Sequence, residues 1–350
     1  MAYDLRDRNL VKRQRLPTGS YYFQTHRFLQ HKVLQKLASD DKLKPELEKA
    51  FQQAFQILRR ATPSASPIQV PTPELWVKFE RTLPHLISFQ AAVASVNVRG
   101  TLAYARLLSD AGMNMWERGL SADGLRLLEA AEKHLKELNS KEELLMASIN
   151  VIIVLLIWDH GISRRNESLD RIKNALTIRQ NHQNNTLRPD SSEIPRTDDI
   201  LLHNAWSDYA VTQLQFHKVS EAEPIFERCF EKYKIWGTED EIPYEYAKYH
   251  HHKAFCNLYR GKMDEAIAQA RKGLSLMQQA TAHDSSLSYR FQFDLACILF
   301  QTEDIGSALI LHEEVLEKRL SWSKYSFLTL QSYYAVGSLK AHLLDFGAAE

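Results

Sequence analysis

A three-residue motif recurs along the chain from residue 124 onward. A small residue is followed by a bulky one four positions later and by another small one three positions after that, so all three lie on one face of a helix. The complete copies are Gly124/Leu128/Ala131, Ser168/Ile172/Ala175, Ala222/Phe226/Cys229, Ala266/Ala270/Gly273 and Ala308/His312/Val315. A sixth copy begins at Ala349. Self-similarity on this scale predicts a fold of stacked, related units.

The spacing of the motif defines the length of the unit. First members of successive copies lie 44, 54, 44, 42 and 41 residues apart. The one long interval contains NHQNNTLRPDSSEIPRTDD, residues 181–199, whose Asn, Pro, Ser and Asp content predicts a loop inserted between repeats. The fourth copy departs from the pattern at Ala270 and Gly273, so its packing is the least well predicted.

A second apolar-periodic segment precedes each copy, as in LHNAWSDYAVTQLQF before Ala222 and YRFQFDLACILFQT before Ala308. The repeating unit is therefore expected to be a helical hairpin. The amphipathic face of one hairpin cannot be buried alone, and stacking supplies its partner. We predict an all-α solenoid of about six hairpins over residues 103–350, with the last repeat incomplete.

Composition excludes several classes of partner. The 350 residues carry 44 basic and 43 acidic side chains, a net charge of +1, which gives no field to attract nucleic acid or an anionic membrane. The N-terminus is charged where a signal peptide is apolar. The longest apolar run, VIIVLLIW at 151–158, is far shorter than the roughly 20 residues of a membrane span. We expect a cytoplasmic protein that contacts neither nucleic acid nor membrane.

The three cysteines, Cys229, Cys256 and Cys297, are too far apart for a CxxC metal or redox motif. Their pattern favours reduced thiols that act as small apolar residues. None of them has a nearby histidine that suggests an activated thiolate, and no GxSxG serine motif occurs. We therefore predict a protein that is not an enzyme.

Histidine patterns give no metal site. Consecutive helical residues point about 100° apart, so the run at 250–252 cannot converge on one ion. His251 is expected to face the concave surface, flanked by His250 and His252. His312 begins HEEVL, which lacks the second histidine of HExxH and predicts a core position. Neither metal nor other cofactor is expected.

A large residue followed by a small one marks the helix crossings, as at Ala111-Gly112, Leu295-Ala296 and Val336-Gly337. Gly261, five residues before Ala266, is placed in a turn. The length of the unit alone also fits HEAT or armadillo repeats. These side chains, with ALTIR at 175–179 and LHEEVLEKRL at 311–320, resemble tetratricopeptide repeats (TPR) of the longer variety found in kinesin light chains and in fungal NOD-like proteins. The resemblance covers about 103–350 and implies a right-handed TPR superhelix.

The first hundred residues lie outside the repeats. Their order is similar to the segment that joins the nucleotide-binding module to the repeats in fungal NOD-like proteins, a winged-helix end followed by a helix that ends in Leu-Pro-His. The matching residues are His26, Arg27, Leu29, Gln30, Trp76, Leu83, Pro84 and His85. The expected domains are a winged-helix-like remnant and helix at 1–61, a Pro/Ser linker at 62–73, a helical cap at 74–102 and the array at 103–350.

In that wider class the histidine at the place of His26 contacts a bound nucleotide. No GxxxxGK[ST] loop, whose backbone amides and lysine cradle phosphates, occurs in the sequence. We therefore expect no nucleotide site, and His26 to be structural or exposed. Lys253 and Asn257 resemble the carboxylate clamp by which some TPR proteins hold a peptide C-terminus, but both lie about half a turn from the clamp positions.

The concave surface is the predicted binding site, because the first helix of each hairpin lines it. Its expected residues are Asn204, Ser207, Lys248, His251, Phe255, Arg290, Phe293 and Tyr334. Mixed aromatic and polar side chains suit an extended peptide or a partner helix; the open alternative is that they only cover the array.

The leading hypothesis for function is a non-catalytic scaffold for protein–protein contacts. The alternative is the sensor or oligomerisation part of a larger NOD-like nucleotide switch. LKAHLLDFGAAE, 339–350, stops where the second helix of a sixth hairpin would begin, so we expect part of a longer protein or a shortened relative. Solenoids normally finish with a polar cap, and an uncapped repeat favours self-association.

Overall fold

A computed structural model describes residues 11–15, 21–25, 27–96, 98–138, 141–158, 162–186 and 195–343. The chain divides into two compact units. The first comprises Met1–Thr62 and Thr82–Gly100, and the second comprises Pro63–Arg81 and Thr101–Glu350. Each unit is described by itself below. Residues 63–81 thus group with the repeats rather than with the chain that precedes them.

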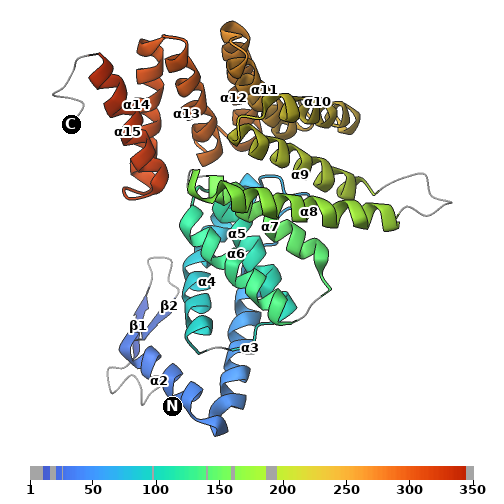
Figure 1. The fold of residues 1–350 in the computed structure, drawn as a ribbon. Helices are drawn as coiled ribbons and strands as arrows, with labels where there is room; N and C mark the ends of the chain where they lie inside the picture. The colour runs from blue at the N-terminus through green and yellow to red at the C-terminus, as the bar shows by residue number, and fades with distance from the viewer. Residues whose placement is uncertain are drawn as a thin grey trace. The chain divides into compact units, whose positions relative to one another are not determined.

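The first unit combines a short β-hairpin with helices (Figure 1). Strands β1 (Val11–Arg15) and β2 (Tyr21–Thr25) pair antiparallel, with Val11 opposite Thr25. Helix α2 (Arg27–Ser39), the 3-10 turn η1 (Asp41–Leu43) and α3 (Lys44–Ala61) follow. The buried face of α3 repeats with helical period, and its Phe51 ring stacks at 5.4 Å on Phe89 of α4 (Trp76–Val96). This hairpin is the one part of the described chain that is not helix or connection.

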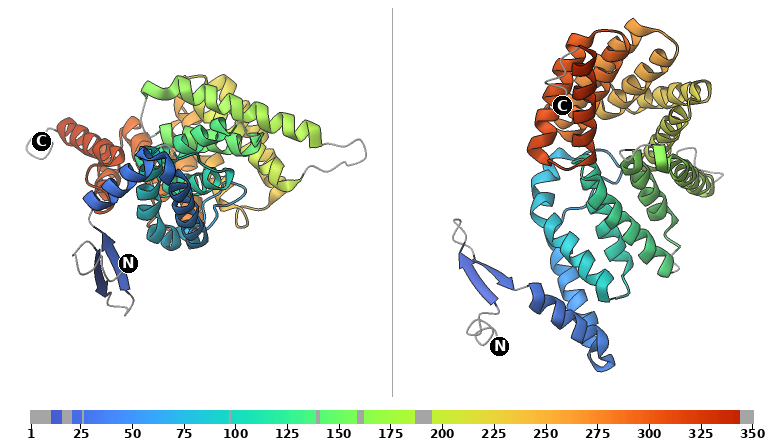
Figure 2. Two further views of the ribbon diagram at one scale, coloured as in Figure 1. Left: turned by 90° about the horizontal axis from the view of Figure 1, so that it is seen from below. Right: turned by 60° about the vertical axis from the view of Figure 1, so that its left-hand side comes forward.

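The second unit is built from antiparallel helical hairpins. A 3-10 turn η2 (Pro73–Leu75) precedes α4, and η4 (Ile162–Arg164) precedes α8. The hairpins are α5 (Leu102–Glu117) with α6 (Ser121–Glu137), α7 (Glu143–Ile157) with α8 (Arg165–Thr186), α9 (Arg196–Gln215) with α10 (Val219–Trp236), α11 (Pro243–Tyr259) with α12 (Met263–Thr281), and α13 (Ser286–Gln301) with α14 (Ile305–Trp322). Helix α15 (Phe327–His342) packs on α14. The predicted all-α repeat superhelix is confirmed, and Figure 2 shows its pairs following one another.

The turns inside four hairpins share one backbone geometry. Each contains a residue with positive φ, in the left-handed conformation that glycine adopts most easily. These residues are Gly119, His217, Gly261 and Glu303. Each stands five positions before the small residue that opens its motif copy, and in each the next amide donates to a carbonyl five residues back, as Lys262 does to Asn257 at 2.9 Å. The shared turn fixes the spacing of the repeat.

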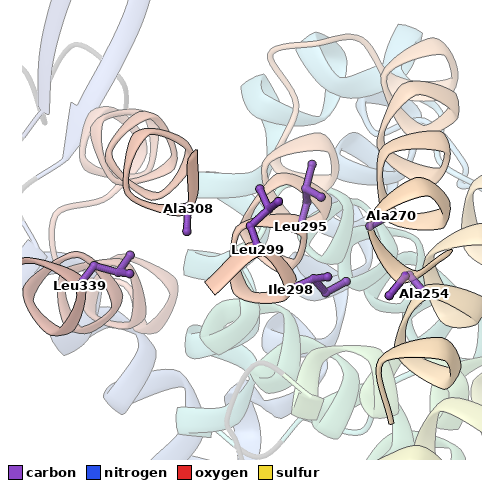
Figure 3. Packing of buried hydrophobic residues seen from close by; sticks show 8 residues of the cluster. Ala254, Ala270, Leu295, Ile298, Leu299, Ala308 and Leu339 are labelled. Atoms are coloured by element: carbon purple, nitrogen blue, oxygen red, sulfur yellow. The ribbon is translucent and has the colours of Figure 1, made fainter. Parts of the chain in front are cut away.

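Small residues in the motif, and opposite it on the first helix, allow close approach of helices. A Cβ at Gly112 would lie 2.5 Å from Leu128 Cγ, and one at Gly124 would lie 3.0 Å from Leu156 Cδ1. Side chains from successive hairpins then interlock into a continuous core. One such cluster joins α11 to α15 through Ala254, Ala266, Ala270, Leu295, Ile298, Leu299, Ala308 and Leu339 (Figure 3).

The departure of the fourth motif copy has a structural cause. A Cβ at Gly273 on α12 would lie 3.0 Å from the backbone nitrogen of His251 and 3.2 Å from the carbonyl oxygen of Ala247, both on α11. Backbone cannot move aside as a flexible side chain can. The two helices therefore pack backbone to backbone, which also explains why Ala270 takes the place of a bulky residue.

Gly273→Ala is expected to lower the free energy of unfolding by about 1–3 kcal/mol, the usual cost of overpacking. Gly306→Ala on α14 is the matched control, because a Cβ there meets nothing within 4 Å. That change should stabilise the protein by a few tenths to about 1 kcal/mol, because alanine is the better helix former. Urea unfolding of both variants measures the two changes in free energy of unfolding. If Gly273→Ala stabilised the protein as Gly306→Ala does, the close approach of α11 and α12 would be refuted.

Candidate functional site

A cavity of about 330 Å³ lies within the second unit. It is lined mainly by apolar and aromatic side chains, with a few charged groups among them. Most come from the first helices of the hairpins, and the others come from the second helices α12 and α14 and from α15. The lining includes Trp116, Leu155, Trp158, Val211, Leu214, Tyr244, Phe255, Tyr259, Met277, Leu287, Phe291, Phe293 and Leu328. Its size falls at the lower end of the range for small-ligand or side-chain pockets.

The cavity brings together helices far apart in the chain because the first and last hairpins meet. A Cβ at Gly119, in the turn after α5, would lie 2.5 Å from Ser286 Oγ and 3.3 Å from Leu328 Cδ1. Ser286 begins α13, and Leu328 is in the first turn of α15. The end of α5 therefore contacts both helices, which is why Trp116 shares the cavity with Leu328.

Five of the eight residues predicted for the concave surface line this cavity. They are Lys248, His251, Phe255, Arg290 and Phe293. Asn204 and Ser207 are outside the lining. Both are buried on α9, and Tyr233 Oη donates to Asn204 Oδ1 at 3.5 Å.

The remaining predicted residue, Tyr334 on α15, is 79% exposed and also lies outside the cavity lining. The part of α9 that lines the cavity is instead Asp208, Val211, Leu214 and Gln215. On α9 the cavity is thus lined by Asp208, the neighbour of the predicted Ser207.

A buried ion pair lies at the wall of the cavity. Lys248 Nζ on α11 is 3.5 Å from Asp208 Oδ1 on α9, and both side chains are less than a tenth exposed. Burial raises the pKa of Asp208, while the charges of Lys248 and Arg179 lower it. The pair ties the first helices of two successive hairpins together.

The three consecutive histidines point to three different neighbours. His250 Nδ1 lies 2.7 Å from Gln269 Oε1 on α12, and the His252 ring lies 4.8 Å from the Phe226 ring on α10. His251 faces the cavity, where its ring stacks on Phe291 at 4.1 Å. Among the described residues, no group of three His, Cys, Asp or Glu side chains is placed to hold a metal ion.

His251 and His252 differ in their polar surroundings. His251 Nε2 lies 2.9 Å from Asp294 Oδ2 on α13. His252 also lines the cavity but is buried, and burial, then the nearby His251 and Lys248, lower its pKa well below the usual range. It is therefore a neutral ring at neutral pH.

Arg319 is a lining residue that the sequence analysis missed. It lies on α14, a second helix, yet it is buried and lines the cavity. Nη1 donates to the carbonyl oxygen of Leu328 at 2.8 Å and to Ser332 Oγ at 2.9 Å, and Cζ lies 4.6 Å from the centre of the Phe293 ring. The arginine thus joins α14 to α15 behind the cavity wall.

One expectation about the cysteines is wrong. Cys297 does have a histidine neighbour, because its Sγ lies 3.9 Å from Nε2 of His312 across the α13–α14 hairpin. His312 fills a buried position, as predicted. Burial raises the pKa of the Cys297 thiol to about 12 and lowers that of His312 to about 4. The two groups are therefore neutral, and the thiol is not activated as a nucleophile.

The remaining sequence motifs have structural surroundings. Lys253 Nζ pairs with Glu223 at 2.8 Å and with Glu227 at 2.5 Å. Of the residues that carry the NOD-like resemblance, Trp76 and Leu83 to His85 lie on α4, and His26 lies outside the described residues. None of the helices described is long and apolar enough to cross a membrane.

Comparison with known proteins gives matches only among solved structures, since no family model and no curated protein matches the sequence. NprR in complex with its cognate peptide NprX aligns with a TM-score of 0.50 and 15% identity, covering 91% of this chain and 88% of that one. Rap complexed with competence and sporulation factor aligns with a TM-score of 0.42 and 12% identity, covering 99% of this chain and 91% of that one. A Podospora anserina putative kinesin light chain with nearly identical TPR-like repeats aligns with a TM-score of 0.36 and 16% identity, covering 62% of this chain and 96% of that one. The chain has a TPR-like helical-repeat fold.

Proposed function

We propose that this protein is a non-catalytic peptide-binding scaffold, and that its cavity receives an aromatic or long aliphatic anchor of an extended partner segment. The observation that carries the proposal is the cavity itself, about 330 Å³ and walled by tryptophan, tyrosine, phenylalanine and leucine side chains from several hairpins. Buried aromatic anchors supply most of the energy in such interfaces. The NprR structure of similar fold holds a peptide, as its name states.

The charges at the cavity argue for an apolar anchor rather than a charged one. Lys248 is paired with Asp208, and Asp294 with His251. Arg319 donates to a carbonyl and a hydroxyl. A charged anchor placed against Lys248, Asp294 or Arg319 would have to replace one of these contacts, whereas an apolar side chain there would only displace water.

Peptide selection tests the proposal. A random peptide library is panned against the protein, and the enriched peptides are measured by fluorescence anisotropy against two variants. Val211→Trp fills the cavity, and Ile310→Trp adds the same group on α14 at a position that is 60% exposed and outside the lining. Affinity should fall about tenfold or more, roughly 1.4 kcal/mol, for the first only. Peptides that bind both variants equally, or no enrichment, would refute the proposal.

The setting proposed is a cytoplasmic one, supported by the free state of Cys229, Cys256 and Cys297. Self-association through the last helix stays a prediction, motivated by exposed apolar residues of α15 such as Leu330 and Tyr334. No observation within the described residues favours the alternative of a NOD-like nucleotide switch, and it is not proposed further.

A further inference from the structure

The segment 63–75, PSASPIQVPTPEL, packs against the repeats and is not an exposed linker. It forms no helix or strand before η2, yet it runs along the repeats and is mostly half-buried. A turn at Ser66 to Gln69 interrupts it, where the Gln69 amide donates to the Ser66 carbonyl at 3.1 Å. Pro63, Pro67, Pro71 and Pro73 restrict its backbone, which lowers the entropy cost of holding it in one conformation.

Side chains of the repeats hold this segment at three points. At the first, Ala65 N donates to Asp110 Oδ1 on α5 at 3.2 Å. At the second, Gln69 Nε2 donates to the Ser148 carbonyl on α7 at 3.2 Å, while Gln69 Oε1 accepts from Arg179 of α8 at 2.5 Å. At the third, Thr72 N donates to Glu117 Oε2 on α5 at 3.0 Å, and Trp76 Nε1 donates to the same oxygen.

The groups that hold the segment are built into the array rather than lying on its surface. Glu117 and Arg179 are almost completely buried. Arg179 also donates to the Leu201 carbonyl on α9, so the residue that grips Gln69 is fixed by the next hairpin. The first and third points recognise backbone N–H groups, and the second recognises the amide side chain of Gln69. This is how proteins bind an extended peptide, with backbone contacts for affinity and a few side chains for specificity.

We propose that α5, α7 and α8 form a second peptide-binding surface, separate from the cavity, and that residues 63–75 are its ligand bound in cis. The ligand class is an extended, proline-containing segment with a glutamine at the place of Gln69. The proposal does not depend on the cavity. While the segment is in place, its covalent attachment gives it an effective concentration near the millimolar range, so a free peptide of the same sequence is excluded.

A binding experiment in trans tests this. In one variant, residues 64–72 are replaced by a Gly/Ser sequence of the same length. The probe is a fluorescent synthetic peptide with the sequence of residues 62–75. Fluorescence anisotropy should show saturable binding to the variant and none to the unaltered protein. Binding to both proteins alike, or to neither while the variant retains its helical circular dichroism, would overturn the proposal.

Changes in the probe test the mode of binding. Gln69→Ala removes the contacts to Ser148 and Arg179 and should weaken binding about tenfold or more. Glu74→Ala, at an exposed position, is the control and should leave affinity unchanged or slightly higher. Equal affinity of the Gln69→Ala and unaltered peptides would contradict the assignment.

Hydrogen exchange on the full chain covers the case in which the replaced variant does not fold. The amides of Ala65 and Thr72 should be protected in the unaltered protein and should exchange at least several times faster in full-length Gln69→Ala. Exchange at the unprotected rate in the unaltered protein, or identical exchange in both, would also refute a ligand held in cis.

Discussion

Lys248→Met should lower the free energy of unfolding by about 3–5 kcal/mol, the usual cost of leaving one charge of a buried pair without its partner. The change removes the ammonium group that lies 3.5 Å from Asp208 Oδ1 but keeps a long apolar side chain on α11. Asp208 must then stay buried as an anion with the charge of Arg179 as its remaining support, or take up a proton. Urea unfolding at neutral pH measures the loss.

A double variant separates the charge from the packing. Lys248→Met combined with Asp208→Asn removes both charges and should recover most of the loss, since a neutral buried pair no longer carries an unpaired ion. The matched control is Lys272→Met, whose partner Glu239 is also a carboxylate but whose pair is about two-fifths exposed. That change should cost less than about 1 kcal/mol. Equal costs for Lys248→Met and Lys272→Met would show that the buried pair does not hold α9 against α11.

The double variant also bears on function. If the cavity receives an apolar anchor, peptides selected on the unaltered protein should bind the refolded double variant with little change in affinity. A loss of more than about tenfold would instead indicate that the ligand contacts the charges directly. Stability and recognition are thereby measured on the same two residues.

The repeat fold is predictable from sequence because its determinants are local. Gly261 and Ala266 stand five residues apart in one turn, and the same spacing recurs at His217 and at Glu303. Helical period then identifies the buried face of each hairpin. The motif also places the small residue Gly273 on the buried face of its helix. The sequence does not show why glycine is needed there, because the reason is the backbone of α11 packed against it.

The candidate site is less predictable because it depends on rotation between hairpins. Helical period does not say whether Ser207 or Asp208 faces the cavity, since the answer depends on how α9 is turned by its neighbours. Arg319 lines the cavity although it belongs to a second helix, and helical period gives no reason to expect a residue of α14 there. Glu117 holds residues more than forty positions away, and nothing near Thr72 in the sequence signals that contact.

Glu117→Gln is expected to change how stability depends on pH. Burial, and to a smaller degree the charge of Glu74, raise the pKa of Glu117 to about 7, while hydrogen bonds from Trp76 and Thr72 and the charge of Arg118 act in the opposite direction. The unfolded carboxyl titrates near 4.5. Between these values the folded protein binds more protons than the unfolded chain, so the contribution of Glu117 to stability falls as pH rises.

The size of the effect follows from the shift, about 3 kcal/mol at 1.36 kcal/mol per pKa unit. A glutamine oxygen can still accept from Trp76 and Thr72, but it does not titrate. Relative to the unaltered protein, Glu117→Gln should be about equally stable near pH 4.5 and more stable by about 3 kcal/mol at pH 8. Urea unfolding of both proteins between about pH 4.5 and pH 8 measures the difference in their stability. All other titrating groups are the same in the two proteins, so their contributions cancel in that difference. Glu80→Gln, at a half-exposed position beside Arg118, is the control and should change stability by less than about 1 kcal/mol, the usual cost of an exposed ion pair. A difference between Glu117→Gln and the unaltered protein that stays constant with pH would mean that Glu117 remains ionised throughout, held so by the segment that it binds.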